Sequence, residues 1–293
     1  MARRAPAVER SAAILNLLAA HPGKKFTLSE IARDLDINKA TLHAILNALM
    51  QAGYLVRDHT AKSYGLGAVL IALGNAALGG YPAADAAVPE MHALSEELRL
   101  DVVASAAIHD EIVILEYSGT PRPFGVYVQA GQRIPLTPPI GSVFIAWSDP
   151  EAIERWIGKL GASVTKDEVA SYRKAVEAVR IRGYSVGLEG GSQRDLVDAL
   201  SGTKKKGERR TLEEGVRAVR TEEYAVTELD PNASYRPNQI GAPVFGPNGE
   251  VALGLFLIGF QGAISGSQVE FLASRLRASA DRVTKATHGR EPE

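Results

Sequence analysis

The sequence predicts an α+β protein of two domains, and three observations carry this prediction. The chain has 293 residues, more than the roughly 100–200 residues that one domain commonly holds. Apolar residues recur at helical spacing in the first part of the chain, whereas apolar runs separated by Gly and Pro turn signals follow later. Hydrophobic residues make up 45% and charged residues 23%, which excludes wholesale disorder, a collagen repeat and a coiled-coil rod.

The composition also excludes several kinds of chemistry. The chain has no cysteine, so disulfides, thiolate zinc sites, iron–sulfur clusters and a cysteine nucleophile are ruled out. No apolar run approaches the 18 or so residues that a membrane helix needs. The basic start, Met1–Pro6, is not followed by a signal-like apolar stretch. We therefore expect a cytoplasmic protein with no membrane partner.

Charge is unevenly distributed along the chain. The formal net charge is −1, yet residues 1–75 hold nine Lys and Arg against five Asp and Glu. The remainder holds 24 basic and 29 acidic residues. A small basic unit followed by a larger acidic one favours a polyanion as the partner of the amino-terminal part.

Three helices are predicted in the amino-terminal part. The first spans residues 8–20 and ends before Pro22, which cannot continue the helical hydrogen-bond ladder. The second covers residues 28–35 and begins at the capping-box pair of Thr27 and Glu30. A third helix over residues 39–52 follows a tight connection and has Asn38 as its cap.

The third helix has two different faces. A buried stripe at helical spacing is expected along Leu42, Ile45, Leu46, Leu49 and Met50. The opposite face is slim, free of acidic residues and made of Lys39, Ala40, Thr41, His43, Ala44 and Asn47. Two helices joined by a short turn, with such a second helix, are typical of a DNA-binding helix-turn-helix. The alternative is a three-helix structural or protein-binding module.

A short hairpin follows the third helix. Apolar stretches at residues 54–56 and 63–66 bracket a polar tip at residues 57–62, which resembles the wing of a winged helix. We therefore predict a winged helix-turn-helix over residues 1–67. Its predicted DNA contacts are Thr27, Asn38, Lys39, Ala40, Thr41, His43, Asn47, Arg57 and Lys62.

Five sequence blocks of this unit occur in a familiar order and spacing: Arg10–Leu15, Thr27–Ala32, Asn38–His43, Gly53–Asp58 and Tyr64–Gly67. Together they resemble the isocitrate lyase regulator (IclR) family of bacterial transcription factors. The resemblance implies a winged helix joined by a linker helix to a GAF-like antiparallel-sheet sensor domain. Ala44 departs from the pattern, because that family commonly has Arg there, so one backbone contact to DNA is expected to be missing.

The rest of the chain is predicted to hold the linker and the sensor domain. The linker covers residues 68–85 and contains an Ala/Leu-rich helix at 68–80, which by the resemblance helps to pair two subunits. The sensor domain covers residues 86–293 and opens with a helix at about 86–99. Its further expected elements are strands at 101–108, 112–117, 124–128, 240–245 and 251–259, and helices at 167–182 and 266–286.

Two polar stretches of the sensor domain have simple explanations. His109-Asp110-Glu111 suggests catalysis or a metal, but adjacent turn residues point in different directions, so a polar hairpin turn is predicted. An insertion at about 187–229 interrupts the resemblance and contains a helical stretch at 209–220. Its basic run, residues 204–210, either touches DNA phosphates or, as we expect, forms a solvated loop.

The sensor domain also contains a candidate effector site. A Pro-rich loop leads into a helix start at Gly141, Ser142 and Val143, whose free N–H groups suit an anion. In the resembled family, effectors lie between this helix start and the last two strands.

Four positions carried over from the family indicate what the effector is. The polar ligand-binding residues common among regulators of small hydrophilic acids correspond here to Asp230, Ile240, Phe256 and Ile258. Because three of the four are apolar, the resemblance implies an apolar or aromatic acid whose carboxylate lies on Gly141 and Ser142. Alternatively, Phe256 fills the pocket and no ligand binds.

Two other classes of function compete with this prediction. An enzyme is not expected, because the chain has no G-x-S-x-G, Walker loop, H-E-x-x-H, or G-x-G-x-x-G at a strand–helix joint; no cofactor or metal is expected either. A ligand-independent DNA-binding, architectural or interaction factor with a vestigial sensor domain is the second alternative. The favoured prediction is a homodimer or tetramer that binds a pseudo-palindromic double-stranded DNA operator and a small-molecule effector.

Overall fold

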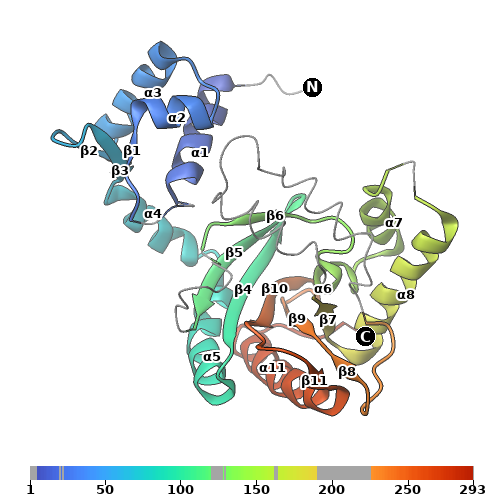
Figure 1. The fold of residues 1–293 in the computed structure, drawn as a ribbon. Coiled ribbons are helices and arrows are strands. Elements are labelled where there is room, and N and C mark those ends of the chain that lie inside the picture. Colours follow the sequence, from blue (N-terminus) through green and yellow to red (C-terminus); the bar gives the residue numbers. More distant parts are fainter. Residues whose placement is uncertain are drawn as a thin grey trace. The chain divides into compact units, whose positions relative to one another are not determined.

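The computed structural model describes residues 5–19, 21, 23–119, 128, 130–161, 164–189 and 226–292. The chain divides into two compact units, Met1–Tyr81 and Pro82–Glu293 (Figure 1). The predicted linker at residues 68–85 is thus not a separate unit, because its helix belongs to the first unit and its last residues to the second. Within the described ranges, no helix is long and apolar enough to cross a bilayer.

The amino-terminal unit combines helices with a small antiparallel sheet. Its helices are α1 (Pro6–Ala19), α2 (Leu28–Asp34), α3 (Lys39–Gln51) and α4 (Val69–Leu78). Its strands, in the order β1-β3-β2, are β1 (Phe26–Thr27), β3 (Ser63–Leu66) and β2 (Leu55–Asp58). The expected helices and hairpin are confirmed, whereas β1 was not expected because two residues are too few to show alternation.

The core of this unit lies behind the recognition helix α3. Ile14, Phe26, Ile31, Leu42 and Leu46 are each at most 1% exposed. Burying one such side chain contributes about 1.5–3 kcal/mol. The apolar stripe of α3 therefore fixes which of its faces remains at the surface.

The second unit is built on a six-stranded antiparallel sheet in the order β6-β5-β4-β10-β9-β7. In chain order these strands are β4 (Asp101–Ile108), β5 (Glu111–Ser118), β6 (Arg133–Pro135), β7 (Ser185–Leu188), β9 (Pro237–Phe245) and β10 (Val251–Ile258). A separate ribbon pairs β8 (Ser234–Tyr235) with β11 (Ile264–Ser265).

Helices pack on both faces of this sheet. Helices α5 (Pro82–Leu98) and α11 (Gly266–Ala286) share one core with Leu253, Leu255 and Leu257 of β10. Phe256 lies between Leu255 and Leu257 in sequence but belongs to a second core. This core includes α6 (Ser142–Ile145), α7 (Pro150–Gly158) and α8 (Lys166–Arg182). Successive side chains along a strand point to opposite faces of the sheet, so Leu255 and Leu257 join one core and Phe256 joins the other.

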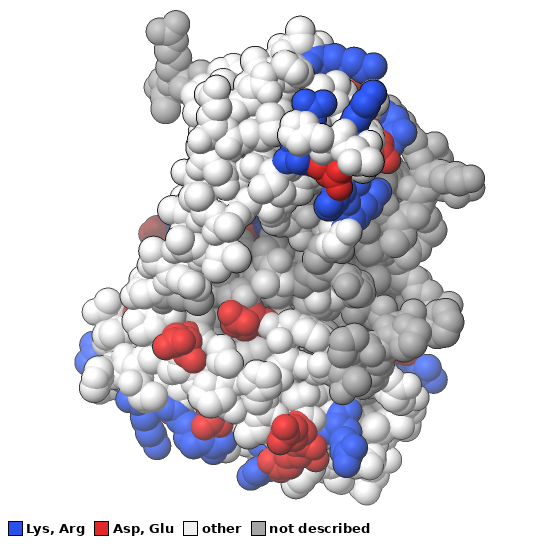
Figure 2. Space-filling model, turned by 90° about the vertical axis from the view of Figure 1, so that its left-hand side faces the viewer, with Lys and Arg blue, Asp and Glu red and all other residues white. Residues whose placement is uncertain are grey.

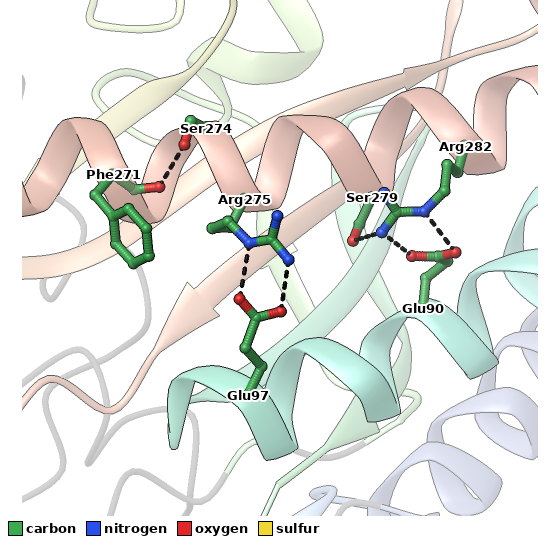
Figure 3. Close-up of polar contacts among 7 residues, drawn as sticks. All are labelled: Glu90, Glu97, Phe271, Ser274, Arg275, Ser279 and Arg282. Carbon is green, nitrogen blue, oxygen red and sulfur yellow. Dashed lines mark hydrogen bonds and ion pairs between the residues drawn. The ribbon is translucent and has the colours of Figure 1, made fainter.

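Two ion pairs join α5 and α11 (Figure 3). Arg275 donates to both carboxylate oxygens of Glu97 at 2.7 and 2.8 Å, and Arg282 to those of Glu90 at 2.8 and 2.6 Å. Arg282 also donates to Ser279 Oγ at 2.8 Å. These hydrogen bonds hold the pKa of Glu90 and of Glu97 below the usual carboxyl range. The helix pair is thus tied by charge as well as by apolar packing.

Some elements differ from the expectations. The helix expected at 86–99 begins at Pro82, which suits the first turn of a helix. Strands β6 and β7 and helix α7 were not expected, although α7 has a clear start in its cap Asp149 and the following proline. Residues 187–188, counted in the insertion, belong to β7. The helix at 209–220 and the basic run at 204–210 lie outside the described residues, as does the strand at 124–128 except for its last residue.

The polar triplet after β4 is a hairpin turn, as predicted. Ile108 pairs with Glu111, so His109 and Asp110 form the turn. Asp110 accepts a hydrogen bond from Lys159 at 2.7 Å, and Glu111 accepts one from Arg133 Nε at 2.7 Å. The acidic side chains therefore have separate partners. Among the described residues, no group of three or more His, Cys, Asp or Glu is placed to hold a metal ion.

Candidate DNA-binding face and candidate effector site

The exposed face of α3 carries the residues expected to contact DNA. Lys39, Ala40 and His43 are exposed, and Thr41 and Asn47 are half-buried. Four residues of the predicted stripe are buried, namely Leu42, Ile45, Leu46 and Leu49, and the fifth, Met50, is half-buried. The first turn holds no acidic residue, so nothing on it repels phosphate.

Two of the exposed side chains on α3 interact with each other. The Asn47 amide lies 3.2 Å from Nδ1 of His43, one helical turn away. An amide nitrogen only donates, so Nδ1 accepts this hydrogen bond and Nε2 is left for another partner. The pair keeps three free polar groups, namely the His43 Nε2–H, the second Asn47 amide N–H and the Asn47 amide oxygen, a combination suited to the edges of bases.

Two other predicted contact residues cap helices. Asn38 accepts a hydrogen bond from the Thr41 N–H at 2.9 Å, and Thr27 forms a capping box with Glu30 at the start of α2. The Thr27 N–H and hydroxyl both donate to the Glu30 carboxylate at 2.8 Å and hold the pKa of Glu30 below its usual range. Thr27 and Asn38 therefore have a structural role in fixing both helices of the motif.

The wing is braced by an aspartate that the sequence did not single out. Asp58 accepts hydrogen bonds from the Ala61 and Thr60 N–H groups and from Lys25 Nζ, each at 3.0 Å. The Ala61 hydrogen bond, followed by that of Lys25, holds the pKa of Asp58 below its usual range. An Asp two residues before a Thr, at the end of a strand, is a recognisable turn signal.

The basic residues of the wing are exposed around this turn. Arg57 lies on β2 with its guanidinium 5.7 Å from the centre of the Tyr64 ring, and Lys62 occupies the turn in a left-handed conformation (φ 48°). Figure 2 shows Lys and Arg side chains gathered around a small acidic group on the amino-terminal unit. An acid-free helix beside a basic hairpin is the arrangement expected of a winged helix-turn-helix.

In the second unit, α6 and β10 bring several predicted effector residues together. Val143, Phe256 and Ile258 share the core on the α6–α8 face of the sheet. The Phe144 and Phe256 ring centres are 6.1 Å apart. Gly141 is buried immediately before α6, and Ser142 is half-buried.

A row of four residues crosses the sheet on this face. Val103 on β4 pairs with Phe256 on β10, which pairs with Gly241 on β9, which pairs with Ser185 on β7. Gly241 leaves a gap in the row, and the Phe256 ring lies across it: a Cβ atom added at Gly241 would lie 2.5 Å from that ring.

Two predicted effector residues lie elsewhere. Ile240 is fully buried in the opposite core, under α5 and α11, because it is one residue out of phase with Phe256. The residue that faces Ile258 across the strands is Gln239. Asp230 is exposed beside the start of α11, where it accepts a hydrogen bond from the Asn232 N–H at 2.9 Å. In the structure, Ile240 and Asp230 therefore do not lie together with Val143, Phe256 and Ile258.

The expected anion site at the start of α6 also loses its basis. Helix α6 has only four residues, too few for aligned peptide dipoles to sum to an appreciable charge. Its preceding loop is instead anchored to the protein, since Trp156 Nε1 donates to the Ile140 carbonyl at 3.2 Å. Of the three residues, Val143 belongs to the core that contains Phe144 and Phe256, and Gly141, two residues earlier in sequence, is buried.

These features define a DNA-binding transcription regulator with a winged helix-turn-helix and a separate α+β domain. Residues 7–59 match the model of the IclR helix-turn-helix domain. The chain is 30% identical over 194 residues to the glycerol operon regulatory protein of Streptomyces coelicolor, covering 64% of this chain and 75% of that protein. The chain belongs to the IclR family of transcriptional regulators, and like its relatives it is a regulator rather than an enzyme.

Solved structures show the same fold over almost the whole chain. An IclR transcriptional regulator from Alicyclobacillus acidocaldarius superposes with a TM-score of 0.68 at 22% identity, covering 98% of this chain and all of that one. An IclR homologue from Microbacterium hydrocarbonoxydans, complexed with 4-hydroxybenzoate, gives a TM-score of 0.61 at 17% identity and covers 95% of this chain and 98% of that one.

Proposed function

We propose that the chain binds a pseudo-palindromic operator through α3 and the wing, with α3 in the major groove. The observation that carries this proposal is the exposed, acid-free face of α3 bearing Lys39, His43 and Asn47. Lys39 is the phosphate contact in this proposal, and the His43–Asn47 pair reads bases. A regulator of transcription works where the chromosome is, so we place it in the cytoplasm.

A salt series of operator binding tests this assignment. Each lost phosphate contact lowers the slope of log affinity against log salt by about 0.9. We expect Lys39→Ala to weaken binding and to lower the slope by that amount in fluorescence anisotropy. Lys166→Ala, which removes an exposed lysine from α8 in the other unit, is the matched control. Equal slopes for the native protein and Lys39→Ala would contradict the contact.

We also propose that the protein acts as a dimer paired through α4. This helix has Val69, Ile71 and Leu73 exposed to 40%, 67% and 47%. Two half-sites about 34–36 Å apart, or a multiple of that, match two paired winged helices. We expect Ile71→Glu to yield monomers in light scattering, whereas the exposed apolar Ile181→Glu on α8 leaves the mass unchanged. A tetramer of such dimers is the other outcome compatible with the proposal.

For the effector, we propose a small aromatic or apolar molecule bound on the α6–α8 face of the sheet. Val103, Phe144 and Phe256 supply an apolar surface there, worth about 25 cal/mol for each Å² covered. The similar fold that holds 4-hydroxybenzoate supports an aromatic ligand. A carboxylate on the ligand would find little positive charge at the start of α6, because this helix has only four residues.

Calorimetry on the full chain separates the effector classes. We expect 4-hydroxybenzoate or an uncharged aromatic analogue to bind more tightly than glycerol, a probe chosen for the glycerol operon regulator among the relatives. Tighter binding of glycerol would contradict an aromatic effector. If no small molecule binds while operator affinity persists, the alternative of a ligand-independent factor, with Phe256 filling the site, takes its place.

A further inference from the structure

Ser185 is a buried hydroxyl group that lacks a partner. Its side-chain oxygen has no hydrogen-bond partner in the described structure, and the residue is only 3% exposed. Buried hydroxyls in folded proteins are nearly always hydrogen-bonded. The unpaired hydroxyl in the edge strand β7 is therefore open to a hydrogen-bond partner that the described residues do not supply.

The Ser185 side chain points to the candidate effector face. The next residue, Val186, packs in the core under α5 and α11, so by strand alternation Ser185 faces the other way. A Cβ atom added at Gly241 would lie 2.9 Å from Ser185 Oγ and 2.5 Å from the Phe256 ring. The unpaired hydroxyl and the ring thus both lie against the same backbone position, Gly241.

A second glycine extends the surface under the Phe256 ring. A Cβ atom at Gly254 would lie 2.6 Å from this ring and 2.9 Å from the ring of Phe144. Gly241 and Gly254 lie diagonally on neighbouring strands, opposite Phe256 and Pro243, and neither places a side chain under the Phe256 ring; we call these two positions the glycine strip. A strip of this kind accommodates a flat ring, and the ring that occupies it here belongs to the protein itself.

We propose that Ser185 is the polar anchor of the effector site, and that the Phe256 ring holds the place of the effector's ring until the effector displaces it. This inference rests on the proposed aromatic effector on this face. The ligand class is a small phenol, with a ring for the glycine strip and a hydroxyl for Ser185. The phenol hydroxyl and the Ser185 hydroxyl can each donate and accept a hydrogen bond. A hydrogen bond between them would give Ser185 Oγ the partner that it lacks without ligand.

Calorimetric titration with phenol and toluene tests the anchor, because the two compounds are similar in size and only phenol carries a hydroxyl. Phe256→Ala should bind both compounds more tightly than the native full chain, since no ring has to move. Adding Ser185→Ala to this variant should weaken phenol by about three- to tenfold, the worth of one hydrogen bond, and leave toluene unchanged. Adding Ser279→Ala instead, which removes a buried serine on α11, should change neither affinity.

The possible failures have different meanings. If Ser185→Ala weakens both compounds equally, or leaves phenol unaffected, the anchor is overturned while an aromatic effector stands. If neither compound binds Phe256→Ala, both the anchor and the proposed effector class are overturned. Should circular dichroism show that Phe256→Ala does not fold, Phe256→Leu replaces it, and the same loss specific to phenol is required.

Discussion

The proposed DNA-binding face and the proposed effector face depend on contacts of different range. On α3 the contacts are local: Asn38 caps Thr41, and His43 meets Asn47 one turn later. On the sheet, the row from Val103 through Phe256 and Gly241 to Ser185 joins four strands from distant parts of the chain. A substitution on α3 removes one local contact and leaves the others in place. A substitution in the row across the sheet also affects its neighbours, because each side chain limits the space available to the next.

The largest effect is expected from adding one methyl group to the row. Gly241→Ala places a Cβ atom 2.5 Å from the Phe256 ring and 2.9 Å from Ser185 Oγ. Overpacking of this kind costs about 1–3 kcal/mol, and we expect the free energy of unfolding in urea to fall by that amount. The affinity for aromatic compounds should change as well, because the added Cβ atom forces the Phe256 ring away from the glycine strip.

Gly158→Ala is the matched control for this substitution. A Cβ atom at Gly158 meets nothing within 4 Å, and the residue closes helix α7. Alanine is preferred to glycine in helices by about 1 kcal/mol, so no loss of stability is expected. A Gly241→Ala variant as stable as Gly158→Ala would refute the tight row.

A smaller effect is expected at the cap of the recognition helix. Asn38→Ala removes the hydrogen bond to the Thr41 N–H and should lower stability by about 1 kcal/mol. Asn38→Asp retains a capping oxygen but adds negative charge to the face proposed to meet phosphate. We expect thermal unfolding of Asn38→Asp to match the native protein while its operator affinity falls. If Asn38→Asp binds the operator as tightly as the native protein, Asn38 does not lie in the DNA interface.

The smallest effect concerns the ion pair between α5 and α11. Glu90 has a pKa below the usual carboxyl range because Arg282 donates hydrogen bonds to it, so its contribution is present above that range and is lost as the pH falls through the lowered pKa. The Arg282 side chain is 54% exposed, so solvent screening limits the contribution to about 0.2–1 kcal/mol. Glu90→Gln should lower stability by that amount at pH 7 and flatten its decline below about pH 4. An unchanged acid profile in this variant would show that other carboxylates dominate.

The difference between local and long-range contacts also explains which features the sequence predicts correctly. The buried stripe of α3 and the capping residues Thr27 and Asn38 follow from spacing within one helix, and the structure bears them out. Which residues share the effector face depends on the register between strands, and there Gln239, not Ile240, lies opposite Ile258. The position of Asp230 depends on tertiary contacts of its turn with the start of α11, which sequence spacing does not reveal. Ser185 carried no sequence signal, since only the pairing of β7 with Gly241 places it on this face.

Selection from a random library of DNA duplexes tests the central claim most directly. The native full chain and His43→Ala are each used to enrich bound sequences, and the enriched pools are compared. We predict that the native protein enriches a pseudo-palindrome with half-sites one helical turn, or a multiple of it, apart, and that His43→Ala relaxes or changes the preference at one position in each half-site. No enriched sequence with the native protein, or the same sequence with both proteins, would contradict the assignment of α3 as the element that reads the operator.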